Sequence, residues 1–204
     1  NILFHINHIT VPEVMQVLVQ DENCKIDAFL GPSHVSVISG SKIYEEFPLS
    51  YNKPVVVSGF EPVDVMQSIS MIVKQFKEKR SDLEIEYKRL VSYEGNLKAQ
   101  ELINRYFKKV PFKFRGIGEV ENSGYELKDE FDKYNAKIVY KDILPTHEVK
   151  ENKACKCPEI LKGVAKPTDC KIFGTVCTPT NPIGSCMVSS EGACSAYYKY
   201  GNLL

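Results

Sequence analysis

The sequence lacks an excess of charge of either sign. Its 204 residues carry 26 Lys and Arg against 26 Asp and Glu, so the formal net charge is +0. A neutral chain has no basic footprint for nucleic acid or for an anionic membrane surface, and we expect neither as a partner. With 43% hydrophobic and 25% charged residues, the chain has the composition of a protein that folds around a core.

Long hydrophobic runs are also missing. No apolar stretch approaches the ~18 residues that a membrane-spanning helix requires. The opening residues NILFHINHIT have no basic region and no small-residue cleavage site, so we expect neither a membrane-spanning nor a freshly secreted protein. The chain opens on Asn1 in an apolar stretch, and we interpret it as a processed or partial chain whose upstream region is missing.

The seven cysteines divide the chain into two compositions. Cys24 stands alone and is interpreted as an ordinary buried cysteine, whereas six others fall within the last 50 residues, among Pro, Gly, Ser and Thr. We therefore predict an α/β domain at residues 1–140 and a small irregular Cys-rich domain at residues 141–204, joined by a connector at 141–153. A segment this short and loop-rich usually needs disulfides or a metal to hold a fold.

Apolar runs alternate with helical periodicity in the first domain. Strands are predicted at residues 2–9, 26–30, 54–58, 83–91 and 112–120. Helices are predicted at residues 11–19, 34–51, 62–76 and 99–107, with Gly40 and Pro48 interrupting the second. Thr10 and Asn96 are the predicted N-caps, with Glu13 reaching back toward the first. Three strand–helix units in a row indicate a parallel sheet with right-handed crossovers.

In such a sheet, ligands meet the loops at the carboxyl ends of the strands. The loops after the first three predicted strands place His8, His34 and Glu61 on one rim, which we take as a candidate site. Alternatively, the two histidines cap helices or lie at the sheet edge, and Glu61 is a first-turn carboxylate favoured by the helix dipole. His5 and His147 are interpreted as structural or solvent-exposed. The glycine loops lack the G-x-G-x-x-G and P-loop spacings, so nucleotide binding is not supported.

The clustered cysteines follow the pattern C-x-C-x12-C-x6-C-x8-C-x7-C. Three disulfides would use all six, but nothing else indicates secretion. Zinc commonly uses C-x2-4-C knuckles, which are absent, and would leave two cysteines over. A [4Fe-4S] cluster takes four thiolates from loops of irregular spacing, and leaves two thiols as redox-active neighbours. The cluster fits the spacing best, with a disulfide framework and a zinc staple as open alternatives.

Several stretches together resemble the hydrogenase maturation protein family HypD. They are the tail motifs at Lys166–Cys170 and Cys186–Tyr198, and the loops Gly31–Ser36, Gly59–Pro62 and Asn122–Gly124. The similarity runs across essentially the whole chain, and the string CMVSSEGACSAYY is specific enough to carry it. One departure is clear, because the family's N-terminal cysteine motif is absent.

The resemblance implies a cytoplasmic accessory protein for [NiFe]-hydrogenase assembly. Members of the family are expected to carry a [4Fe-4S] cluster and to build the Fe(CN)2CO group together with a small HypC-like partner and a HypE-like cyanide donor. The cluster ligands that the resemblance implies are Cys155, Cys170, Cys177 and Cys194. It also implies that Cys157 and Cys186 form a redox dithiol or disulfide beside the cluster, and that His34 and Glu61 lie where the iron is handled. The competing functions are a stand-alone iron-sulfur disulfide reductase or electron carrier, and a zinc-stapled interaction module.

Overall fold

The computed structural model describes residues 1–145 and 152–201. The chain divides into two compact units. The sheet unit is Ile26–Lys108, and the hairpin unit combines Asn1–Lys25 with Lys109–Leu204. The sequence predicts a boundary near residue 140, between residues 1–140 and 141–204, from a change of composition. The two units are defined by contacts in space instead, so this boundary stays a prediction. His147 of the predicted connector lies outside the described residues.

The sheet unit confirms the mixed α/β class with a parallel sheet. Its three strands, β1 (Phe29–Pro32), β2 (Val55–Ser58) and β3 (Leu83–Ile85), pair in parallel in sequential order. The central strand β2 is buried at all four residues, as expected for a strand covered on both faces. The parallel register pairs Pro32 with Ser58, so the carboxyl ends of β1 and β2 lie side by side.

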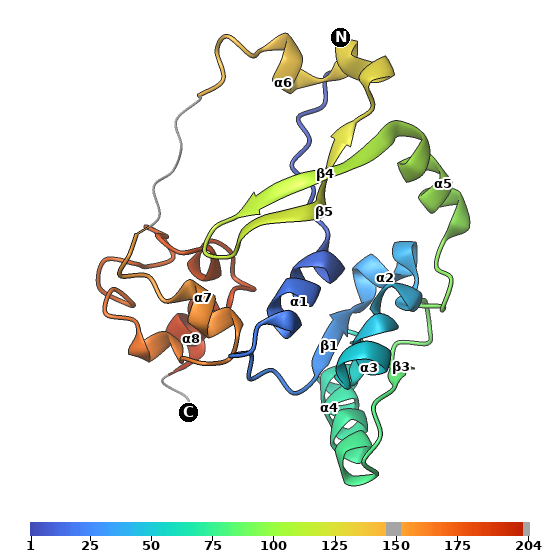
Figure 1. The fold of residues 1–204 in the computed structure, drawn as a ribbon, viewed down its shortest axis with the longest axis vertical. Helices are drawn as coiled ribbons and strands as arrows, with labels where there is room; N and C mark the ends of the chain where they lie inside the picture. The colour runs from blue at the N-terminus through green and yellow to red at the C-terminus, as the bar shows by residue number, and fades with distance from the viewer. Residues whose placement is uncertain (146–151, 202–204) are drawn as a thin grey trace. The chain divides into compact units, whose positions relative to one another are not determined.

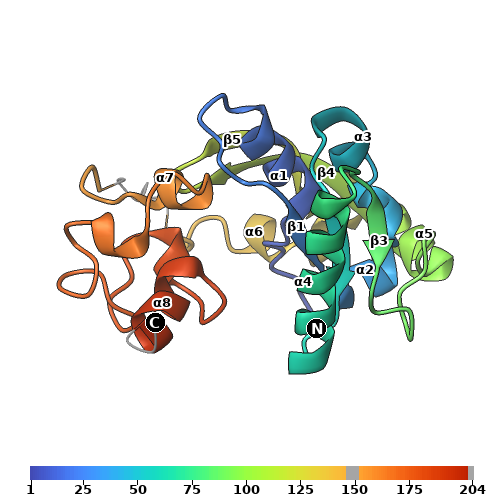
Figure 2. The same cartoon turned by 90° about the horizontal axis from the view of Figure 1, so that it is seen from below.

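Short helices connect and cover these strands (Figure 1). They are α2 (Ser33–Ser39), the 3-10 turn η1 (Ser41–Tyr44), α3 (Glu46–Tyr51), α4 (Pro62–Lys77) and α5 (Leu97–Tyr106). The longest, α4, packs against β2 (Figure 2). Gly40 breaks the predicted 34–51 helix, because its φ of 79° ends α2. Pro48 does not break it, since it lies in the first turn of α3, where the missing N–H costs no helical bond.

The hairpin unit corrects two predicted strands. Residues 2–9 form no strand of the parallel sheet. They make only isolated bridges, Phe4 with Asn135 and Ile9 with Gly124. Residues 112–120 are not one strand but the end of β4 (Phe107–Phe114), a turn and the start of β5 (Gly118–Leu127). Gly116 and Gly118, at φ of 84° and 100°, permit this turn, because glycine adopts such φ values without strain.

The remaining elements of the hairpin unit are mostly short. They are α1 (Val11–Gln20), the 3-10 turn η2 (Asp129–Tyr134), α6 (Ala136–Val139), α7 (Cys157–Leu161), the 3-10 turns η3 (Pro167–Asp169) and η4 (Ser185–Met187), and α8 (Ala193–Tyr200). α1 packs against β5. In the described residues, no helix has both the length and the apolar character needed to cross a bilayer.

The two predicted helix caps have different outcomes. Asn96 caps α5 as predicted, because its side chain accepts a hydrogen bond from Ala99 N at 3.1 Å. Thr10 precedes α1 but makes no cap bond, since its hydroxyl donates instead to Asn122 O at 3.5 Å. Glu13 forms an ion pair with Lys109.

One buried polar side chain joins α4 to β3 in the sheet unit. Gln75 is fully buried, donates from Nε2 to Glu84 at 2.7 Å, and accepts from Asp82 N at 2.7 Å. We expect Gln75→Met to lower the free energy of unfolding of this unit by about 1–3 kcal/mol, because it leaves the Asp82 amide without its partner. Hydrogen exchange at the β2 amides of the whole chain measures the loss.

The matched control for this prediction is Gln67→Met, an exposed site on the same helix. It is expected to change the free energy of unfolding by less than about 0.5 kcal/mol. Equal protection of β2 in the two variants would show that Gln75 does not stabilise the unit.

Candidate functional site

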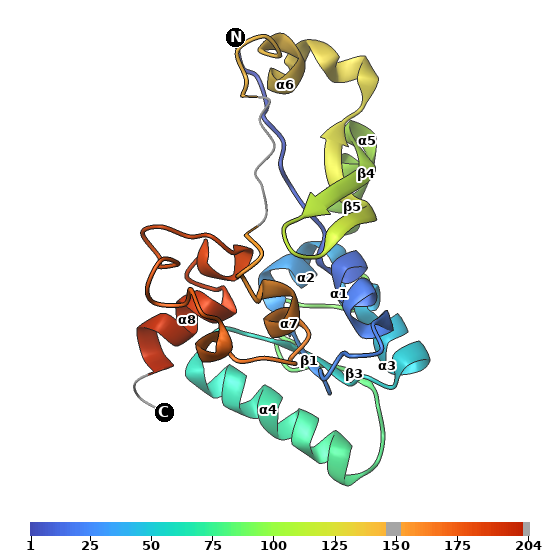
Figure 3. The same cartoon turned by 60° about the vertical axis from the view of Figure 1, so that its left-hand side comes forward.

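Helix starts and tight turns place the six clustered cysteines. Cys157 is the first residue of α7, Cys186 lies in η4, and Cys194 is the second residue of α8. Cys170 ends η3, and Cys177 forms an isolated bridge with Phe173. Pro158 follows Cys157 in the first turn of α7, where its fixed φ favours the helix start. Figure 3 shows α7 and α8 within this loop-rich part of the hairpin unit.

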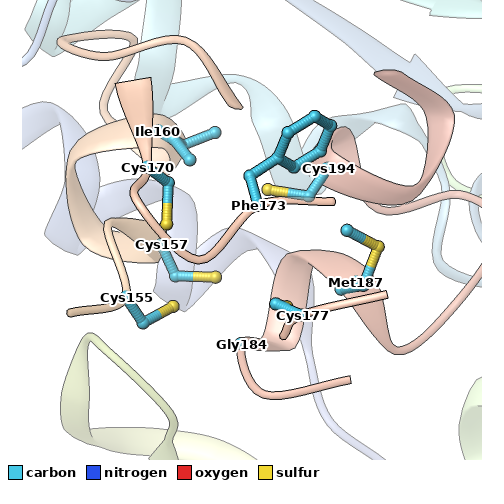
Figure 4. Close-up of a pocket in the computed structure, with 9 residues that line it drawn as sticks. All are labelled: Cys155, Cys157, Ile160, Cys170, Phe173, Cys177, Gly184, Met187 and Cys194. Atoms are coloured by element: carbon cyan, nitrogen blue, oxygen red, sulfur yellow. The ribbon is translucent and has the colours of Figure 1, made fainter. Parts of the chain in front are cut away.

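The side chains of these cysteines converge. Five of them line a single pocket, together with four apolar residues or glycine (Figure 4). The lining residues are Cys155, Cys157, Ile160, Cys170, Phe173, Cys177, Gly184, Met187 and Cys194. The sixth cysteine, Cys186, is buried in the same hydrophobic cluster. All four ligands that the resemblance implies therefore lie around one pocket, while Cys24 is half-buried and lies elsewhere in the chain.

Hydrogen bonds concentrate on the sulfur of Cys157. Cys186 N donates to Cys157 Sγ at 3.3 Å, and Ser185 Oγ donates to it at 3.6 Å. The Cys186 thiol also donates to this sulfur, and this bond is the main cause that lowers the pKa of Cys157 to about 5. The same bond raises the pKa of Cys186, because the Cys186 thiol loses this hydrogen bond when it gives up its proton. The pair therefore combines one thiolate with one thiol.

Two other thiols of the pocket, those of Cys155 and Cys194, are protonated at neutral pH. Burial raises the pKa of Cys155 to about 11 and that of Cys194 to about 12. Backbone groups also hold two further sulfurs. Ile183 N donates to Cys177 Sγ at 3.4 Å, and the Cys170 thiol donates to Ala154 O at 3.5 Å. A thiol binds a metal as the thiolate, so loading these cysteines would release protons.

The described part of the chain holds neither a disulfide nor a formed metal site. All seven cysteines are free thiols. Across residues 1–145 and 152–201, no group of three or more Cys, His, Asp or Glu side chains is arranged to hold a metal ion. What the residues present do offer is a donor set of soft sulfur ligands in an apolar surrounding, which is the chemistry that zinc and iron-sulfur clusters use.

The carboxyl ends of β1 and β2 form a second candidate site, in the sheet unit. His34 follows β1 at the start of α2 and packs against Phe60, with the ring centroids 5.1 Å apart and the ring planes tilted by 42°. Glu61 follows β2 and precedes α4, and 76% of its side chain is exposed. The loops with His34 and Glu61 are thus neighbours, as predicted. His8 does not belong to this rim, because residues 2–9 form no strand of the sheet; its carbonyl accepts from Tyr125 N. His8 and His5 are both exposed.

Sequence reasoning missed the charged group that supports this rim. Asp64, only 3% exposed, accepts two hydrogen bonds from Arg89 Nη2 at 2.9 and 2.8 Å, and Arg89 stacks over the Tyr87 ring. Arg89 Nη2 also lies 3.9 Å from Glu61 Oε2. A Cβ at Gly59 would come within 2.1 Å of Asp64, so the glycine of this loop leaves room for the buried carboxylate. The sequence does show Asp64 as an acidic residue in the first turn of α4, and this was the one sign of the buried carboxylate. Nothing in the sequence indicated its partner Arg89.

Four pocket residues were also missed. Ile160, Phe173, Gly184 and Met187 line the pocket with the cysteines, and Met187 is only 1% exposed. Gly184 and Met187 lie within two positions of Cys186 in the sequence. This closeness was the only sequence feature that could have placed them beside the cysteines.

Comparison with known proteins gives one family. The HypD family model, described as the Hydrogenase formation hypA family, matches residues 1–201. The hydrogenase maturation factor HypD2 of Bradyrhizobium diazoefficiens is 46% identical over 202 residues, which are 96% of this chain and 53% of that protein. The hydrogenase maturation factor HypD of Cupriavidus necator is 45% identical over 201 residues, which are 95% of this chain and 52% of that protein.

An archaeal relative extends the similarity. A putative hydrogenase expression/formation protein of Methanocaldococcus jannaschii is 45% identical over 193 residues, covering 95% of this chain and 53% of that protein. The chain spans about half the length of the curated relatives it matches. With a family model that matches nearly every residue and relatives above 40% identity, the chain belongs to the HypD family.

Proposed function

We propose that this chain is part of a cytoplasmic maturation factor for [NiFe]-hydrogenase. In this proposal it assembles the Fe(CN)2CO group of the hydrogenase active site with a small HypC-like partner, and it receives cyanide from a HypE-like donor. The observation that carries the proposal is the convergence of five cysteines on one pocket, with the sixth hydrogen-bonded to Cys157, in a chain of the HypD family.

The pocket suits a [4Fe-4S] cluster bound by Cys155, Cys170, Cys177 and Cys194. Such a cluster supplies electrons one at a time. The protein contributes four thiolates, an apolar wall and the backbone donor at Ile183, which bonds to the sulfur of Cys177. Apolar burial and hydrogen bonds to the sulfurs are the means by which a protein tunes such a centre.

Cys157 and Cys186 are the proposed dithiol. Forming a disulfide from the Cys157 thiolate and the Cys186 thiol releases two electrons and one proton, and reducing it takes up the same number. The Cys186 N–H and the Ser185 hydroxyl hold Cys157 as the thiolate, which is the form that attacks a disulfide or binds iron. The thiol of Cys186 supplies the proton and the second sulfur.

The rim of the sheet unit is the proposed place where the assembling iron is handled. His34 and Glu61 present an imidazole and a carboxylate at neighbouring strand ends, while Arg89 is positioned between buried Asp64 and exposed Glu61. We propose that His34 and Glu61 act on the iron or its ligands, and that Asp64 and Arg89 fix the loop that carries Glu61.

Metal analysis is the first test of the cluster. We expect the anaerobically purified chain to hold about four iron and four sulfide, with a brown absorption that bleaches when dithionite is added. Cys170→Ala and Cys177→Ala should lose most of this iron, because each removes one of four thiolates. Cys24→Ala is the matched control and should keep it.

The alternative functions give different results in the same assay. About one zinc per chain without iron or sulfide would contradict the cluster and support a zinc-stapled interaction module. Catalytic reduction of small disulfides by the iron-loaded chain, in a strain whose hydrogenase matures without it, would support a stand-alone disulfide reductase.

The dithiol is tested separately from the cluster. We expect Cys157→Ser to keep the iron and sulfide content, since Cys157 is not a proposed ligand, but to reduce hydrogenase maturation at least tenfold in cells that depend on this gene. The reason is that serine can neither form the disulfide nor offer a thiolate. Full hydrogenase activity together with an intact cluster would refute the dithiol's role.

The rim is tested by small changes at its two exposed groups. His34→Gln and Glu61→Gln should each lower hydrogenase maturation severalfold without changing iron-sulfur content or the melting temperature, since both side chains lie on the surface of the sheet unit. Gln67→Met, exposed on α4, serves as the control. A loss of cluster in either rim variant would contradict a separate role for the rim.

A further inference from the structure

The turn between β4 and β5 is bonded to the segment that carries Cys186. Arg115 Nη1 donates to Ile183 O at 2.8 Å, and Ser185 Oγ lies 3.4 Å from Arg115 O, which shares the single hydroxyl proton with Cys157 Sγ. The two bonds join residues 68 and 70 positions apart in the sequence. Figures 1 and 3 show this end of the hairpin beside the loops around α7.

The same turn packs against the start of α7. A Cβ at Gly116 would lie 3.2 Å from Pro158 Cγ and 3.7 Å from Cys157 Cβ, so the backbone of the turn is in close contact with this helix start. The turn therefore contacts the chain on both sides of the thiol pair, beside Cys157 through Gly116 and near Cys186 through Arg115.

The segment bonded by Arg115 is shaped around two sulfurs. Gly184 has φ of −95° and ψ of 153°, an extended conformation that any residue adopts. A Cβ there would nevertheless lie 2.5 Å from Cys155 Sγ and 2.6 Å from Cys157 Sγ. The glycine is thus needed for space beside the sulfurs rather than for its backbone freedom. The next two residues, Ser185 and Cys186, donate their hydrogen bonds to Cys157 Sγ.

We propose that the β4–β5 turn, through Arg115, is a positioning element for the Cys157–Cys186 pair. By fixing the carbonyl of Ile183 it holds residues 183–186 against Cys157, so that the two sulfurs react with each other rather than with outside thiols. This inference rests on the proposed function in one respect, namely that the pair cycles between dithiol and disulfide.

The chemistry that Arg115 supports can be written with glutathione disulfide as the oxidant. The Cys157 thiolate attacks one sulfur of glutathione disulfide, forming a mixed disulfide and releasing one glutathione thiolate. Cys186, once deprotonated, attacks the Cys157 sulfur and releases the second glutathione. The thiolate–thiol pair loses two electrons and one proton, and glutathione disulfide takes up the two electrons to give one glutathione thiolate and one glutathione thiol. The second step depends on how closely Cys186 is held, and this is the step that Arg115 affects.

The test is the equilibrium of the anaerobically purified chain with glutathione and glutathione disulfide. Acid quenching, alkylation and peptide mass spectrometry give the fraction of chains with a Cys157–Cys186 disulfide and the fraction with glutathione on Cys157. Arg115→Met should lower the equilibrium constant for the internal disulfide at least about tenfold, because a charge-assisted hydrogen bond is lost, and should increase the mixed disulfide. Arg115→Lys, which keeps a cationic donor, should recover part of the loss.

Two further variants separate positioning from general stability. Lys109→Met removes an ion pair with Glu13 elsewhere in the same unit and should leave the disulfide constant unchanged. Gly184→Ala should lower the constant as Arg115→Met does, since its methyl group would displace the sulfur of Cys157.

The outcomes distinguish this inference from the function on which it rests. A normal internal disulfide in Arg115→Met, or an equal loss in Lys109→Met, would overturn the positioning role alone. No Cys157–Cys186 disulfide in the unaltered chain under any glutathione ratio would overturn the redox dithiol and the positioning role together. Neither result depends on whether the chain holds iron, because the measurement reads sulfur pairing directly.

Discussion

The cysteine-rich part of the hairpin unit depends on the burial of its own thiols. Four of the six buried residues in its core cluster are cysteines, and Ile160 and Met187 are the other two. Because its longest helix, α8, has only eight residues, apolar burial alone offers limited stability to so small a segment. Two of these cysteines, Cys177 and Cys194, are also proposed cluster ligands, so the proposed metal binding would be coupled to the folding of this segment. Removing the thiol of Cys177 or Cys194 is therefore expected to affect both, whereas removing that of Cys157 or Cys186 affects the packing of the segment alone.

The sequence predicted correctly those features that depend on a few neighbouring residues. The run Pro54–Ser58 forms the buried central strand, and Asn96 caps its helix, because a strand's apolar run and a cap are both properties of a few consecutive residues. Residues 2–9 have an equally apolar run but bridge to Gly124 and Asn135, more than a hundred positions away. No local pattern encodes that choice of partner. The same limit explains why the sequence predicts one strand at residues 112–120 although two glycines turn the chain there.

The candidate sites show the same difference between features set by neighbouring residues and features set by distant ones. The identities of the clustered cysteines, His34 and Glu61 could be read from the sequence, since each is a chemically distinctive residue in a distinctive stretch. The residues that hold these side chains in place could not be identified from the sequence. Arg89 reaches Asp64 from 25 positions away, and Arg115 reaches Ile183 from 68. Arginines are common on surfaces, so only the fold shows that these two bond to groups beside a site.

The Cys157–Cys186 pair is asymmetric because of where its donors lie. The backbone N–H of Cys186, its thiol and the Ser185 hydroxyl all donate to the sulfur of Cys157. Two of these donors belong to one residue, so Cys186 stabilises the thiolate with the same short segment that carries its own sulfur. A shift of that segment would weaken the thiolate and separate the sulfurs in a single movement. Nucleophilicity of Cys157 and access to its partner are therefore coupled through residues 183–186, which Arg115 holds in place.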